Sequence, residues 1–108
     1  MEKDLREKWE DELKAAIEAE YRRKRSELLR VVQGWLRDVW LFTCQGVEVG
    51  AGALLNFPEL AGTARVAKRV SAPDALENLQ VMEQLQAWLS TNVQEALALE
   101  VGLLKLHL

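Results

Sequence analysis

The chain of 108 residues is poor in residues that cross-link a protein or hold a metal, with one cysteine and one histidine. The lone Cys44 cannot form an intramolecular disulfide, which excludes the disulfide-rich secreted class and favours a reducing, cytoplasmic location. Cys44 and His107 lie far apart in the sequence, so they leave no local set of zinc ligands. We therefore expect no metal site and no cofactor.

The chain also has no strong excess of one charge, since it contains 14 basic and 17 acidic residues and its formal net charge is -3. Proteins that hold nucleic acid through a broad surface need clustered cations, so we expect no direct nucleic-acid contact. The one basic run, at residues 22–25, follows Glu18 and Glu20 in a segment of mixed charge. Such a pattern is typical of a solvated helix face.

Long hydrophobic runs are absent as well. The opening residues are charged throughout, unlike the apolar centre of a secretory signal. The most apolar stretch, residues 93–108, carries Glu95, Glu100 and Lys105 and is shorter than the about 20 mostly apolar residues of a membrane span. We expect a chain that is neither exported nor inserted into a membrane.

Helical periodicity dominates what remains, because only two prolines and six glycines interrupt the chain and apolar residues recur at helical spacing. We expect a single all-α domain over residues 1–108, folded as a compact bundle of about five helices. A long charged first helix over 2–25 continues to about 45, either as one helix or as two abutting ones. A glycine-rich loop at 46–57 follows, and further helices are predicted at about 58–70, 72–90 and 93–107.

Two helix starts carry capping signals. Ser71 can accept a hydrogen bond from the amide of Asp74, and Pro73 suits the first turn of a helix. Asn92, just before the last predicted helix, is a second candidate N-cap residue. In the first helix, large apolar residues recur every four positions and form a stripe along the helix: Leu5, Trp9, Leu13, Ile17 and Tyr21.

Catalytic motifs are missing. No glycine-rich phosphate loop is present, and nothing local would orient Cys44 and His107 as a nucleophile and its base. We therefore expect no enzymatic activity and no catalytic residue, with Cys44 buried at a helix end and His107 exposed. Asp38 and Glu100 lie among apolar residues, and we expect them to form ion pairs, with Arg30, Arg37 and Lys105 as candidates.

The last predicted helix is apolar on nearly all sides. A small domain can cover such a helix only in part, so a partner surface is the natural complement. Tryptophans on helices with long polar faces, Trp9 and Trp88, are candidate interface anchors. The candidate subunit interface consists of Trp88, Leu97, Val101 and Leu104.

Five stretches, in order along residues 26–108, together resemble one family. The first is residues 28–39, with Trp-Leu-Arg-Asp at 35–38, and the second is Asn-Phe-Pro-Glu-Leu at 56–60. Residues 67–71 and 75–77, residues 85–93, and Ala-Leu-Ala-Leu-Glu at 96–100 with two leucines at 103–104 follow. This pattern resembles the C-terminal collar domain of bacterial DNA polymerase III clamp-loader subunits, most closely the delta-prime subunit.

The resemblance implies a non-catalytic helical domain that packs with four homologous collars into a pentameric ring and so joins the subunits that load the sliding clamp in DNA replication. The AAA+ module, which carries ATP contacts and the arginine finger in the family, has no counterpart here, so those roles fall on no residue of this chain. The glycine-rich loop and the charged first helix depart from the family pattern. The gamma/tau collar and a free-standing helical adaptor are the alternatives.

Overall fold

The computed structural model describes residues 1–45, 55–91 and 94–108 and is all-α over these ranges, as expected. It contains α1 (Glu2–Gln45), α2 (Gly62–Ala67), α3 (Ala72–Leu89) and α4 (Glu95–Leu104). The prediction of about five helices is not met in the described part of the chain, which has four. The difference arises in the first 45 residues. The count of five treats them as two abutting helices, whereas the structure has one continuous helix there, α1.

The continuity of α1 follows from its sequence, because no proline lies within its 44 residues. Its only glycine is Gly34, and one glycine lowers helix stability by about 1 kcal/mol relative to alanine without breaking the helix. Ion pairs one turn apart on the surface, Arg6 with Glu10 and Arg22 with Glu18, add support along the exposed part.

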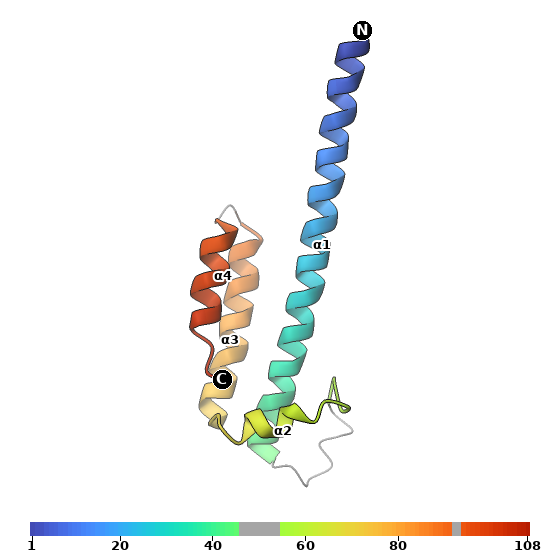
Figure 1. Cartoon of the computed structure of the whole chain (residues 1–108). Coiled ribbons are helices and arrows are strands. Elements are labelled where there is room, and N and C mark those ends of the chain that lie inside the picture. The colour runs from blue at the N-terminus through green and yellow to red at the C-terminus, as the bar shows by residue number, and fades with distance from the viewer. Residues whose placement is uncertain (46–54, 92–93) are drawn as a thin grey trace.

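The molecule is elongated, which corrects the expectation of a compact bundle. Its principal extents are 69 × 26 × 17 Å and its radius of gyration is 19.0 Å, against about 13 Å for a compact domain of 100 residues. Figure 1 shows the cause: α3 and α4 form a hairpin beside the second half of α1, and the first half extends beyond it. Every residue from 2 to 24 is exposed, and we refer to this segment as the arm.

The core lies between the second half of α1 and α3, with α4 packed on the other flank of α3 (Figure 1). Its fully buried centre consists of Leu36, Met82 and Leu85, and α4 contributes Ala98. Gly102 lets α4 approach closely, because a Cβ at this position would lie 3.1 Å from a terminal methyl of Leu85. Ala98 and Gly102 therefore face inward together with the partly buried Leu99, while Leu97, Leu103 and Leu104 remain exposed.

A second, smaller core forms where α2 crosses the end of α1. Val39, Val70 and Ala75 are buried there, and Trp35 packs against both cores. The indole of Trp35 donates a hydrogen bond of 3.0 Å to the hydroxyl of Thr63, which is itself buried. The α-helix in this region is only six residues long, shorter than the predicted 58–70, and its N-cap position, occupied by alanine, supplies no side-chain hydrogen bond.

Asp38 has a different role from the expected ion pair. Its carboxylate is fully buried and accepts hydrogen bonds from the backbone N–H groups of Asn56, at 2.9 Å, and Phe57, at 2.8 Å. The Asn56 side-chain amide also donates to the Gly34 carbonyl. Asp38 thus fastens the segment that precedes α2 to the side of α1, a long-range contact with no local sequence signal.

Ser71 caps α3 in the predicted way, accepting a hydrogen bond of 3.2 Å from the Asp74 amide with Pro73 in the first turn. The glycines of the predicted loop, at 46, 50 and 52, and the predicted cap Asn92 lie outside the described residues. Within the described residues, no helix combines the length and the apolar character needed to cross a bilayer.

Candidate protein interface

The outer face of α4 carries three of the four predicted interface residues. Leu97, Val101 and Leu104 are spaced by four and three positions, so they share one side of the helix. Ala98 and Gly102 occupy the opposite, buried side against α3. Leu104 is 79% exposed and Leu97 is 54% exposed, whereas Val101 is partly buried. The helix therefore presents an apolar stripe to solvent, which we call the α4 outer face.

The fourth predicted residue, Trp88, is partly covered by the chain itself. The ammonium of Lys105 lies 5.3 Å from the centre of the indole, within the range of a cation–π contact. Trp88 and Leu104 also line an open groove of about 530 Å³ between α3 and the residues that follow α4. The structure therefore places Trp88 beside the α4 outer face, in a hollow with both apolar and polar walls.

The segment after α4 is held by Asn78, which lies on the same face of α3 as the buried Met82 and Leu85. Asn78 is fully buried, donates to the His107 carbonyl at 2.9 Å and accepts from the His107 amide at 2.7 Å. These two bonds hold the backbone of His107, one of the residues that line the groove, against α3. No local signal marks this role, since the partners lie 29 positions apart.

Ligand-type atoms of the partly buried Asp74 and of the exposed Glu77 and His107 lie within 4.8 Å of one another, although their spacing in the sequence indicates no metal site. The His107 ring is 3.2 Å from the Glu77 carboxylate. Both of these residues are exposed, and the short contact between them accounts for the position of the ring. Cys44, expected to be buried, is exposed at the end of α1, because Leu36 and Val39 take the core-facing positions there.

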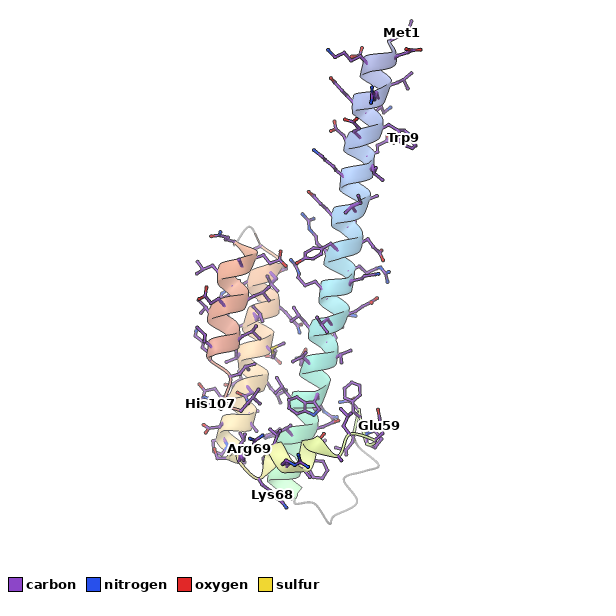
Figure 2. All side chains as sticks on the ribbon, viewed as in Figure 1. Met1, Trp9, Glu59, Lys68, Arg69 and His107 are labelled. Carbon is purple, nitrogen blue, oxygen red and sulfur yellow. The ribbon has the colours of Figure 1, made fainter. Side chains whose placement is uncertain are left out.

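A second apolar surface lies on the arm. The five residues of the predicted stripe are large, and each is between 52% and 71% exposed: Leu5, Trp9, Leu13, Ile17 and Tyr21. We call them the arm row. Figure 2 shows Trp9 on the part of α1 that extends past the hairpin, away from any other helix. Leu5, Trp9, Leu13 and Ile17 are therefore open to solvent, whereas Tyr21, at the base of the row, contacts the hairpin.

The arm joins the hairpin at a polar contact centred on Glu95. The Tyr21 hydroxyl donates to the Glu95 carboxylate at 2.6 Å, and the Arg25 guanidinium lies 3.2 Å from it. The Tyr21 hydrogen bond, together with the Arg25 charge, holds the pKa of Glu95 below its usual value, and the same bond raises the pKa of Tyr21. Arg25 also donates to the Leu89 carbonyl at the end of α3.

This contact predicts a pH dependence. Because the folded-state pKa of Glu95 is lowered, its contribution to stability is present above about pH 4.5, its reference value, and is lost as the pH falls through the lowered pKa. Glu95→Gln is therefore expected to lower the melting temperature slightly at pH 7, and by progressively less as the pH falls below 4.5. Melting curves across this range would contradict the assignment if the difference were independent of pH. Glu83→Gln, on the exposed side of α3, is the matched control.

The basic run at the base of the arm is paired with acids. Arg23 contacts both Glu20 and Glu27, and Arg22 lies 4.0 Å from Glu18. The Glu20 carboxylate accepts two hydrogen bonds from Arg23, and this lowers its pKa. The pairing agrees with the interpretation of a solvated helix face for Arg22 and Arg23, whereas Arg25 is partly buried against the hairpin.

Among the described residues, two groups of exposed apolar side chains form rows along a helix, the α4 outer face and the arm row. Both suit contacts with other polypeptide chains. Comparison of the chain with family models, characterised proteins and solved structures finds no match.

Proposed function

We propose that this chain is a non-catalytic assembly domain, the C-terminal collar of a DNA polymerase III clamp-loader subunit, with delta-prime preferred over gamma/tau. The observation that carries the proposal is the α4 outer face, where Leu97 and Leu104 are more than half exposed. A subunit that docks on this face would bury it, and the burial of apolar surface is the main driving force of such association.

The residues behind the family resemblance also support the proposal. In the Trp-Leu-Arg-Asp stretch of α1, Leu36 and Asp38 are buried and Trp35 packs against both cores. In the stretch on α4, Ala98 faces α3 and Leu97 faces outward. Some of these residues would thus stabilise the fold and others would contact a neighbouring subunit, as a domain in a ring of similar domains requires.

The mechanism assigned to the domain is mechanical. By docking on neighbouring collars it would hold its attached AAA+ module at a fixed place in the ring, so that movements of the modules are coupled when the clamp opens. The domain itself would take no cofactor, carry out no reaction and make no direct contact with DNA. The gamma/tau alternative differs in the parent chain, which would carry an intact phosphate loop.

The proposal is tested by co-expression of the affinity-tagged chain with the other clamp-loader subunits from the same source. We expect the subunits to co-purify with the tagged chain, and a tag fused to an unrelated helical domain provides the control for background binding. Absence of the subunits from the eluate, with the tagged chain folded, would contradict the proposal.

A free-standing adaptor is a second candidate, favoured by the groove beside Trp88. An aromatic anchor in a hollow with apolar walls suits an amphipathic helix from one partner. The adaptor would bind such a helix alone, whereas the collar requires neighbouring domains. Binding to individual clamp-loader subunits, measured one at a time and then in combination, separates the two.

A further inference from the structure

The arm row is a surface that docking on α4 does not use. Its five side chains stand four positions apart, and such i, i+4 rows form the ridges that interdigitate most often when helices pack. The row extends over about 24 Å of helix. Since most helical stability in proteins comes from packing of an apolar face, a helix with this row in water is suited to a partner helix.

The charges on the arm indicate which partner fits. Residues 2–24 contain eight acidic and seven basic residues, so the arm would attract neither a basic nor an acidic partner preferentially. A parallel copy in register would place the basic residues 22–25 beside themselves and the acidic residues 10–12 beside themselves. Like charges at close range oppose such pairing.

An antiparallel copy centred on Leu13 reverses this relation. It places Asp4 opposite Arg22, Arg6 opposite Glu20 and Lys8 opposite Glu18, and Trp9 of one copy would then face Ile17 of the other. One like-charged pair remains, Lys3 with Arg23, and Arg23 already contacts Glu20 and Glu27 within its own chain. The arm is therefore self-complementary about a two-fold axis, as a symmetric dimer requires.

We infer that the arm row binds the arm row of a second copy of this chain in antiparallel orientation, with Leu13 at the two-fold axis. This contact goes beyond the proposed collar function, which uses the α4 outer face, and it would link two copies through their arms. The arm is anchored to the hairpin through Tyr21 and Arg25, so the direction of the pair would be fixed relative to both bodies.

The inference is tested first by sedimentation equilibrium of the whole chain over a range of concentrations. We expect a monomer–dimer equilibrium for the natural chain and for Ala15→Glu, which adds the same charge on the opposite side of the helix. Leu13→Glu should weaken dimerisation by about a hundredfold or more, because the new charge would be buried at the axis. Circular dichroism establishes that both variants keep the same helix content.

The orientation is tested by disulfide trapping in a Cys44→Ser background. Chains carrying Arg6→Cys and chains carrying Glu20→Cys leave the arm row intact, and after mixing and oxidation the mixed disulfide should predominate. The inference is overturned if the natural chain stays monomeric at every concentration, if Leu13→Glu dimerises as well as Ala15→Glu, or if each cysteine variant links mainly to itself.

Discussion

Replacement of Asp38 by alanine is expected to lower the free energy of unfolding by about 2–3 kcal/mol, since the backbone N–H groups of Asn56 and Phe57 lose their acceptor. For a domain of this size that corresponds to a fall in melting temperature of roughly 10–20 °C. Asp38→Asn keeps one acceptor oxygen and should lie between alanine and the natural residue. Urea denaturation followed by circular dichroism measures the differences.

Asp11→Ala is the matched control, because Asp11 is exposed on the arm and has none of these contacts. Its effect should stay within about 0.5 kcal/mol. A stability of Asp38→Ala equal to that of Asp11→Ala would show that the segment before α2 is held by other contacts.

Leu104→Asp is expected to weaken incorporation into the clamp-loader complex strongly while leaving the isolated fold intact. The side chain is 79% exposed, so the substitution costs the monomer little. In the assembled ring the same position would be covered, and burial of an unpaired carboxylate there should weaken binding by about 3 kcal/mol, roughly a hundredfold. Leu97→Asp should act in the same way, and Val101→Asp should also affect stability because Val101 is partly buried.

Leu28→Asp makes the same chemical change at an exposed leucine of α1, outside both the α4 outer face and the arm row. It should retain incorporation. Affinities measured by biolayer interferometry against the immobilised partner subunits would compare the variants, with melting temperatures measured in parallel. Equal affinity of Leu104→Asp and Leu28→Asp would show that the α4 outer face takes no part in assembly.

Local signals account for the parts of the fold that could be predicted from the sequence. The all-α class follows from helical periodicity. The start of α3 follows from Ser71, whose hydroxyl accepts a hydrogen bond from the amide of Asp74, three positions along the chain. The stripe on α4 and the arm row are periodic features of single helices, so their residues could be named before their surroundings were known.

The remaining features depend on contacts between distant segments. The partners of Asp38 lie 18 and 19 positions away, and Asn78 meets a residue 29 positions away. The separation of the arm from the hairpin is also a tertiary property, since periodicity marks an apolar face and does not say whether that face finds a partner in the same chain. The placement of Trp88 beneath Lys105 has the same origin.

Native mass spectrometry of this chain, mixed with the other clamp-loader subunits from the same source, would distinguish a collar domain from a free-standing one. We expect a five-subunit assembly in which each ring contains one copy of the chain, and we expect this assembly to be depleted when Leu104 is replaced by aspartate. Spectra that contain only the free chain, as monomer or self-dimer, beside a ring assembled without it would contradict the assignment of a collar.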